Sequence, residues 1–447
     1  MTQILSPTSS ARAGADLTEA AFSGVSSSVL AERYRDVRAA TEQLAARLEP
    51  DDYCLQSMSD ASPPKWHLAH TTWFFETFIL APASPDYEPF HESFGYLFNS
   101  YYNSIGGAHP RPERGLLSRP TVSEVARYRR HVDALILDLL GRDVLSQQQL
   151  AAVEVGLNHE QQHQELLLTD LKHAFAQNSL HPEYVQSNGP MERVVAPPLR
   201  WTQHDGGLVQ IGHDGGRFGF DNEFPRHAVH LEPFELASRA TTNGEYLEFI
   251  EDGGYEQSEL WLSDGWALVN EQKWDAPLYW EKRDGTWYAF TLWGMRPLDP
   301  AVPVCHISYF EADAFATWAR ARLPREQEWE LAAKDLAVEG TFVERGAFHP
   351  MALRNDDQPL AQMFGDVWEW TSSPYSPYPG FRSLPGSLGE YNGKFMCNQM
   401  VLRGGSCITP QSHMRETYRN FWHPHTRFQF SGLRLARDVG RDASPTG

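Results

Sequence analysis

The 447-residue chain lacks the features that would place it in a membrane or an oxidising compartment. It has no run of 18 apolar residues, so no segment is expected to span a membrane. Residues 1–27 are rich in Ser, Ala and Thr but lack a basic start followed by an apolar core, so no signal peptide is predicted. The four cysteines form no CxxC pair, which favours a reducing cytoplasm over a disulfide framework.

Positive charge is also scarce. The chain has 38 Lys and Arg residues against 58 Asp and Glu residues, which gives a formal net charge of −20. Binding to nucleic acid or to an anionic membrane is therefore not expected, and small molecules are the expected partners. Nothing in the composition predicts an oligomeric state.

The length and the residue patterns predict an α+β protein with more than one domain. Residues 1–27 are interpreted as a disordered leader. Residues 28–180 carry four amphipathic helical patterns, which is typical of an antiparallel four-helix bundle. Residues 181–200 are interpreted as a proline-containing linker. Residues 201–440 hold short β-like runs, many tryptophans, and helical patterns near 243–250, 308–320 and 324–331.

Two histidines, His159 and His163, lie four residues apart in the fourth predicted helix. This spacing places both imidazoles on one helix face, about 6 Å apart at Cβ. A third ligand is expected from the segment 66–70, where both His67 and His70 are candidates. Three histidines without a carboxylate leave open positions on a metal, which favours iron(II) with bound substrate and dioxygen, or zinc with water. The structural alternative is that these are polar core residues.

Two further groups of candidates precede the fourth helix. Tyr101 and Tyr102 are neutral at pH 7 and suited to donating a proton at a metal site, although a tyrosine pair in a loop is more often packing. Arg111 and Arg114 carry guanidinium groups suited to binding a small carboxylate, although surface arginines have no such role in most proteins.

These motifs resemble a known family. Residues 66–70 and 159–163 resemble the DinB-like bundle of non-heme iron sulfoxide synthases. Residues 323–330, 365–371, 401–406 and 430–434 resemble the formylglycine-generating-enzyme fold, which has a C-type-lectin-like topology. Their order along residues 30–438 is that of the ergothioneine-biosynthesis sulfoxide synthases (EgtB type). Ovothiol-type synthases share this order, usually with an added methyltransferase domain that this chain lacks.

The resemblance implies roles for particular residues. It implies that iron(II) is held by three histidines and that the trimethylammonium group of hercynine (Nα-trimethylhistidine) contacts a glutamine and an asparagine. An aromatic residue beside the asparagine offers a face to the quaternary ammonium. The implied ligands are His70, His159 and His163, and the implied substrate contacts are Gln162 and Asn420 with Phe421 or Trp422.

The identity of the thiol substrate depends on where the chain departs from the family. The branch that uses γ-glutamylcysteine carries an acidic residue and an arginine where this chain has Trp422 and Thr426. The tyrosine pair and the two arginines resemble instead the branch that uses free cysteine. The expected reaction is dioxygen-dependent bond formation between cysteine sulfur and C2 of the hercynine imidazole.

Other functions remain open from the sequence. They are γ-glutamylcysteine as the thiol, an ovothiol-type reaction on histidine, and a lectin-like binding module without catalysis. Cys407 follows the 401–406 motif, but no second cysteine matches the pair of formylglycine-generating enzymes, so sulfatase activation is not expected and Cys407 is interpreted as a buried apolar residue.

Overall fold

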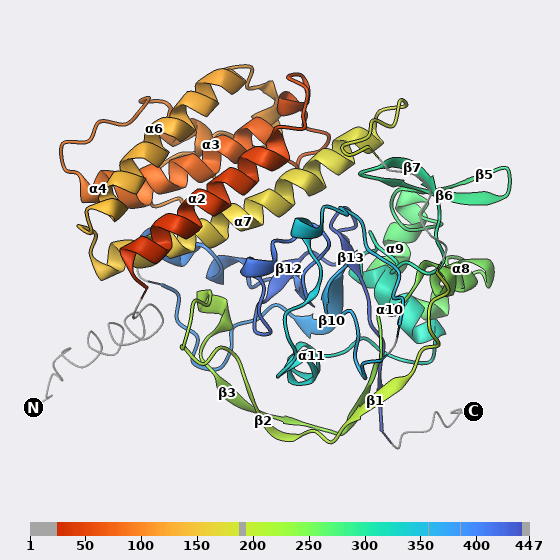
Figure 1. Ribbon diagram of the computed structural model, residues 1–447. Helices are drawn as coiled ribbons and strands as arrows, with labels where there is room; N and C mark the ends of the chain where they lie inside the picture. The colour runs from red at the N-terminus through yellow and green to blue at the C-terminus, as the bar shows by residue number, and fades with distance from the viewer. Residues whose placement is uncertain (1–24, 187–193, 356, 385, 440–447) are drawn as a thin grey trace, which may run out of the picture.

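The structure of the chain is a computed structural model that describes residues 25–186, 194–355, 357–384 and 386–439. Nearly all of the predicted leader therefore lies outside the described residues. A helical bundle and a mixed α/β part lie against each other, and helix α7 (Gln147–Ala176), yellow in Figure 1, runs along the boundary between them. None of the helices in these ranges is both long and apolar enough to cross a membrane.

The bundle contains four long helices within the described residues, as predicted. Thr121 and Ser146 each form a capping box with the residue three positions later, which satisfies backbone N–H groups that a helix start leaves without partners. The region 83–119 between the second and third long helices contains two short helical turns. The bounds are α2 Ser27–Ala45, α3 Pro64–Phe75 continuing as a π-turn over Glu76–Leu80, α4 Ala81–Ala83, α5 Phe94–Phe98 and α6 Val122–Gly141, with 3₁₀ turns at Asp52–Cys54 and Arg111–Leu116.

A buried charge cluster fixes α7 within the bundle. Glu160 is fully buried and forms ion pairs with Arg38 at 2.8 Å and with Arg129 at 3.0 Å. A buried carboxylate is tolerated only when such partners replace its water. Glu160 directly precedes the 161–163 turn, so these contacts limit rotation of the helix that carries His159 and His163.

The C-terminal part consists of small sheets surrounded by helices. Its central sheet has the order β12-β11-β10-β13, in which only β10 and β13 run parallel. The other sheets are β1-β4-β14, β2-β3, β5-β6-β7 and β8-β9. The strand bounds are β1 Trp201–His204, β2 Gly207–Ile211, β3 His227–Leu231, β4 Phe234–Ala237, β5 Trp280–Arg283, β6 Thr286–Thr291, β7 Gly294–Pro297, β8 Gly340–Thr341, β9 Phe364–Gly365, β10 Trp368–Pro374, β11 Met400–Arg403, β12 Asn420–Trp422, β13 Ser431–Gly432 and β14 Ala436–Asp438.

Four α-helices accompany these strands. Three of them match predicted helical patterns: α8 (Asn243–Glu251), α10 (Tyr309–Trp318) and α11 (Glu326–Ala333). The fourth, α9 (Ser263–Gln272), was not predicted. It contains Gly265, which lowers helix propensity, and that glycine packs directly against the side chain of Phe310. The helix therefore depends on a tertiary contact that sequence spacing does not show.

The sequence motifs of the C-terminal part are partners in buried ion pairs. Glu369 in the 365–371 motif pairs with Arg434 in the 430–434 motif at 2.9 Å. Arg403 in the 401–406 motif pairs with Glu326 at 3.2 Å and with Glu330 at 2.8 Å, both in the 323–330 motif. All five side chains are buried, so each charge needs its partner. The motifs thus hold the domain together.

Part of the predicted linker is packed against both domains. The backbone N–H groups of Tyr184 and Val185 donate to the carbonyl oxygen of Leu292, at 2.9 and 3.1 Å. The hydroxyl of Tyr184 donates to the carbonyl oxygen of Leu44 in α2, at 2.8 Å. Residues 187–193 lie outside the described ranges. The connection is therefore anchored at its start rather than free.

Candidate metal centre

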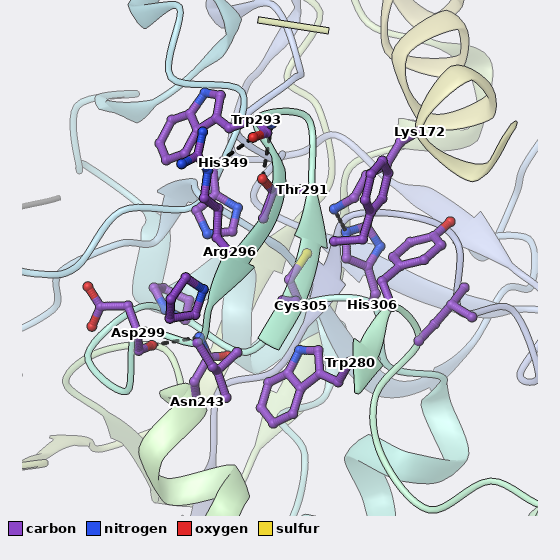
Figure 2. A pocket seen from close by; sticks show the side chains of 17 residues that line it. Lys172, Asn243, Trp280, Thr291, Trp293, Arg296, Asp299, Cys305, His306 and His349 are labelled. Carbon is purple, nitrogen blue, oxygen red and sulfur yellow. Dashed lines mark hydrogen bonds between the residues drawn. The ribbon is translucent and has the colours of Figure 1, made fainter. Parts of the chain in front are cut away.

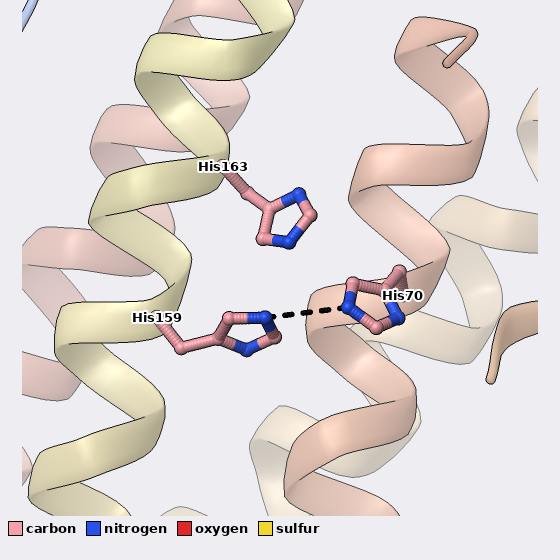
Figure 3. Close-up of side chains that lie close together, drawn as sticks. All are labelled: His70, His159 and His163. Carbon is pink, nitrogen blue, oxygen red and sulfur yellow. Dashed lines mark hydrogen bonds between the residues drawn. The ribbon is translucent and has the colours of Figure 1, made fainter. Parts of the chain in front are cut away.

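Three histidines from two helices meet inside the bundle. His70 comes from α3, and His159 and His163 come from successive turns of α7 (Figure 3). One ring nitrogen of each lies within 4.8 Å of the other two, and the Nε2 atoms of His70 and His159 are 3.3 Å apart. All three side chains are buried. The helical spacing that predicted a shared face for His159 and His163 is therefore present.

Hydrogen bonds behind the cluster select which nitrogen faces it. Nδ1 of His70 lies 2.6 Å from the carbonyl oxygen of Phe98, which can only accept, so Nδ1 carries the proton and Nε2 presents a lone pair. The carboxylate of Asp170 likewise accepts from Nε2 of His67, at 3.1 Å. His67 then accepts through Nδ1 from Nδ1 of His163, at 2.8 Å, which leaves Nε2 of His163 unprotonated.

The network gives His67 and His70 different positions. His70 belongs to the three-histidine cluster, whereas His67 lies behind His163 and orients it. Such outer contacts fix the tautomer and ring orientation of a metal-ligating histidine. Asp170 is held in turn by the backbone N–H of Ser62, at 2.7 Å.

The environment keeps these imidazoles neutral. Burial lowers the pKa of His159 to about 3 and lowers the pKa values of His70 and His163 well below the usual range, with the neighbouring histidines adding to the effect on the last two. Neutral rings that turn Nε2 lone pairs toward one point fit a divalent transition metal. In the described part of the chain this cluster contains no carboxylate, so positions on such a metal stay open to substrates.

Aromatic rings hold the clustered histidines in place. Trp66 stacks on His70 with centroids 4.4 Å apart and planes 13° from parallel, and Trp73 stacks at 5.6 Å and 17°. Phe74 packs against His159 at 4.8 Å. These rings leave His70 little freedom to rotate and keep water from much of the cluster.

One of the two candidate arginines, Arg114, packs against Trp66, one of these aromatic rings. The guanidinium of Arg114 lies 3.4 Å from the ring centre of Trp66 and donates to the hydroxyls of Ser62 and Ser100, at 2.9 and 3.1 Å. It is buried, and none of the ion pairs found among the described residues involves it. Burial first, and then Arg111, lowers its pKa to about 9. An unpaired buried cation beside the cluster is suited to an anionic substrate group.

Arg111 has a different environment. Its side chain is exposed and donates to the backbone carbonyl of Asp60. It therefore differs from Arg114, although both were predicted to hold a carboxylate.

The candidate tyrosines pack against the aromatic residues that surround the histidine cluster. Tyr102 is fully buried and packs against Trp73 at 5.7 Å and Phe78 at 5.0 Å. Tyr101 packs on Tyr102 at 4.8 Å, and burial raises the pKa of its hydroxyl. Both tyrosines therefore lie next to residues that surround the histidines.

A third tyrosine, Tyr391, was missed in the sequence. Its ring lies 5.6 Å from that of His159 and 6.2 Å from that of Tyr101. Its hydroxyl donates to the amide oxygen of Gln162, whose Nε2 donates to the hydroxyl of Tyr418 at 2.7 Å. Tyr391 is more than 200 residues from the metal histidines and follows no recognisable motif, so no sequence signal pointed to it. The side-chain amide of Gln162 is thus hydrogen-bonded to two tyrosines of the C-terminal domain.

The chain is 32% identical to a hercynine oxygenase of Mycolicibacterium thermoresistibile, in a match covering 94% of this chain and 96% of that protein. A hercynine oxygenase of Mycolicibacterium smegmatis is 34% identical, over 85% of this chain and 91% of that protein. The chain belongs to the hercynine oxygenase family.

Other matches agree with this membership of the hercynine oxygenase family. Residues 33–167 match the DinB superfamily, and residues 203–355 and 345–439 match the sulfatase-modifying factor enzyme 1-like domain. The predicted fold class, a DinB-like bundle joined to a formylglycine-generating-enzyme-like domain, is confirmed. The ergothioneine biosynthesis protein 1 of Schizosaccharomyces pombe is 28% identical over 49% of this chain and 28% of that protein.

Asn420, Phe421 and Trp422, implied as hercynine contacts, lie on strand β12. Side chains alternate along a strand, so Phe421 points to the face opposite the other two. Only Trp422 can therefore share a face with Asn420. Phe421 stacks on Tyr375 at 3.9 Å, and Trp422 packs on Phe428 at 5.4 Å.

Phe421 is connected to the candidate tyrosines through the ring of Phe395. Phe395 lies between it and Tyr101, with ring centres 6.1 and 5.3 Å away. The side-chain oxygen of Asn420 accepts from the backbone N–H of Phe421 at 2.9 Å. The substrate roles of these β12 residues stay predictions.

Proposed function

We propose that this chain is an iron(II)- and dioxygen-dependent sulfoxide synthase that joins the sulfur of cysteine to C2 of the hercynine imidazole. The observation that carries the proposal is the set of three buried, neutral histidines with open metal positions, in a member of the hercynine oxygenase family. In the proposed reaction C2 and the thiol each lose one hydrogen. One oxygen atom of dioxygen goes to sulfur and the other leaves as water.

The three histidines are the proposed iron ligands. Iron(II) bound by His70, His159 and His163 would supply open coordination positions and electron transfer to dioxygen. The protein holds both substrates in one orientation, which alone can contribute several kcal/mol to catalysis. Gln162, fixed by Tyr391 and Tyr418, is the proposed contact for the trimethylammonium group.

Arg114 supports a thiol substrate that carries a carboxylate, as cysteine does. Its charge is buried without a carboxylate partner beside the ring that stacks on His70. A cysteine carboxylate would pair with that guanidinium and regain the charge-assisted hydrogen bonds that burial has removed. Ser62 and Ser100 orient the guanidinium.

The test combines metal analysis with oxygen uptake. Anaerobically purified protein loaded with iron(II) should hold one iron per chain and consume dioxygen with hercynine plus cysteine, giving the sulfoxide by mass spectrometry. Turnover with γ-glutamylcysteine instead would change the thiol assignment, and turnover with histidine but not hercynine would indicate an ovothiol-type enzyme. A protein without stoichiometric iron and without oxygen uptake would contradict catalysis and leave a binding module.

The same assay separates the tyrosines. Tyr101, Tyr102 and Tyr391 are the candidate proton donors, and Tyr391 packs directly against the ring of His159. Each Tyr→Phe change keeps the ring and removes the hydroxyl. Loss of sulfoxide formation with iron still bound identifies the donor, whereas an unchanged rate removes that residue from the mechanism. We expect a reduction of about 100-fold or more for the true donor.

A further inference from the structure

A second buried cluster lies at the far end of α7, away from the histidines. Lys172 follows His163 by nine residues, which is about 13 Å along a helix axis. Its side chain is 2% exposed, and its Nζ donates to Nε2 of His306 at 2.6 Å (Figure 2). The ammonium also lies 5.1 Å from the ring centre of Tyr279 and 4.6 Å from that of Phe430. Lys172 belongs to the bundle, and the three partners belong to the C-terminal domain.

The charge of Lys172 has no negative partner among the described residues. Burial lowers its pKa to about 8, so the amine is still mostly protonated at pH 7. His306 accepts its hydrogen bond as a neutral ring. Cys305, beside it, stays a thiol because burial raises its pKa to about 12. A buried ammonium without a counter-charge is strongly disfavoured.

Nearby carboxylates are engaged elsewhere. Asp170 accepts from Ser62 and His67, as described above. Asp299 lines the same cavity, but its carboxylate points away from Lys172 at the opposite end and accepts from the N–H of Ala301 at 2.9 Å (Figure 2).

The cavity next to Lys172 is lined by two polar side chains that each have a buried atom without a partner. Tyr279 and His349 line it, and the Tyr279 hydroxyl and Nδ1 of His349 are buried without a hydrogen-bond partner within the described ranges. The cavity has a volume of about 30 Å³. A water-sized occupant needs roughly 10–15 Å³ on this measure, so there is room for one or two such particles and none for an amino acid.

We propose that this cavity binds a monovalent, halide-sized anion against the Lys172 ammonium, with Tyr279 and His349 as further donors. The anion supplies the missing counter-charge in a space that holds one or two water-sized particles. Because Lys172 comes from the bundle and the other groups from the C-terminal domain, the bound anion stabilises the contact between them. This site is independent of iron and of the proposed reaction.

Halide-dependent stability tests the proposal on the full chain. The melting temperature should be higher in sodium chloride or bromide than in sodium gluconate at equal ionic strength and pH 7. Lys172→Met should abolish this difference, and Tyr279→Phe should reduce it. Lys282→Met, a change at an exposed lysine, should leave it intact.

Bromide-soaked crystals of the unaltered protein give a direct measurement. An anomalous peak within hydrogen-bond distance of Lys172 Nζ is the expected result, and it decides the matter even if Lys172→Met fails to fold. Equal melting temperatures in halide and gluconate together with no bromide peak in the cavity would overturn the proposal.

Discussion

At the scale of single residues, the protons behind the metal histidines determine what the cluster can bind. His67 has no place in the cluster, yet it decides the tautomer of His163 because it accepts the proton of Nδ1. Asp170 in turn decides the tautomer of His67, since a carboxylate accepts and never donates at neutral pH. The negative charge at the end of this chain also makes the ring of His163 a stronger electron donor.

Asp170→Asn tests this relay. The amide is nearly isosteric but can donate, so the His67 tautomer is no longer determined and His163 loses its fixed orientation. We expect iron(II) affinity to fall by about 10- to 100-fold, measured by chelator competition with the folded protein. Asp138→Asn, the same change at an exposed aspartate of α6, is the control. An affinity equal to that of the parent would rule out a positioning role for Asp170.

At the scale of elements, α7 contacts helix α3 with one face and the C-terminal domain with another. His159 and His163 face α3, whereas other residues of the same turns bind the C-terminal domain. The contacts across the boundary are Asn158 to His413 at 3.2 Å, Gln161 to Ser412 at 2.7 Å, Gln162 to Tyr418 at 2.7 Å, and Glu165 to Trp368 at 2.5 Å and to Thr409 at 2.7 Å. The position of α7 therefore sets the metal site and the domain contact together.

Gly156 allows α7 to approach α3 one turn before His159. A Cβ at this position would lie 2.6 Å from the ring of Phe75 and 3.0 Å from that of Phe74. Helix propensity alone favours Ala over Gly by about 1 kcal/mol. The overlap outweighs this, because forcing an extra carbon into a packed core costs about 1–3 kcal/mol.

We therefore expect Gly156→Ala to lower the free energy of unfolding, measured by urea denaturation. Gly141→Ala is the matched control. Gly141 is also a helical residue, the last of α6, but a Cβ added there would meet open space. That variant should keep or gain stability. If Gly156→Ala were as stable as Gly141→Ala, the close approach of the two helices would not limit the packing.

The elements differ in how far the sequence predicts them. The starts of α6 and α7 follow from capping boxes, and the shared face of His159 and His163 follows from helical spacing, because both depend on local geometry. Helix α9 and the position of Tyr391 depend on contacts between distant segments. The opposite faces of Asn420 and Phe421 required knowing that this stretch is a strand.

At the scale of the whole molecule, many charged and titratable groups are buried. Besides the ion pairs between motifs, Glu223 pairs with Arg415, and Glu311 pairs with Arg427 at 2.8 Å. Several histidines are buried as neutral rings, and burial is the main cause that lowers the pKa of each. These histidines are His70, His159, His163, His306 and His413, and the half-buried His349 has a lowered pKa for the same reason.

The buried histidines predict that the metal-free protein loses stability as the pH falls below about 6.5. A histidine whose pKa is lower when folded binds its proton first in the unfolded chain, so protons favour unfolding from the unfolded pKa of about 6.5 downward. For His349 this continues to its folded pKa of about 3. Each such histidine contributes a slope of about 1.4 kcal/mol per pH unit.

His349→Gln isolates one of these contributions, because His349 is remote from the metal ligands. In halide-free buffer, the change should reduce the slope of unfolding free energy against pH between 6 and 4 by about 1.4 kcal/mol per unit. His230→Gln, a change at an exposed histidine, is the surface control. A stability that stays level from pH 7 to 5 in the parent would contradict the neutral burial of these rings, and with it the electrostatic basis of the metal site.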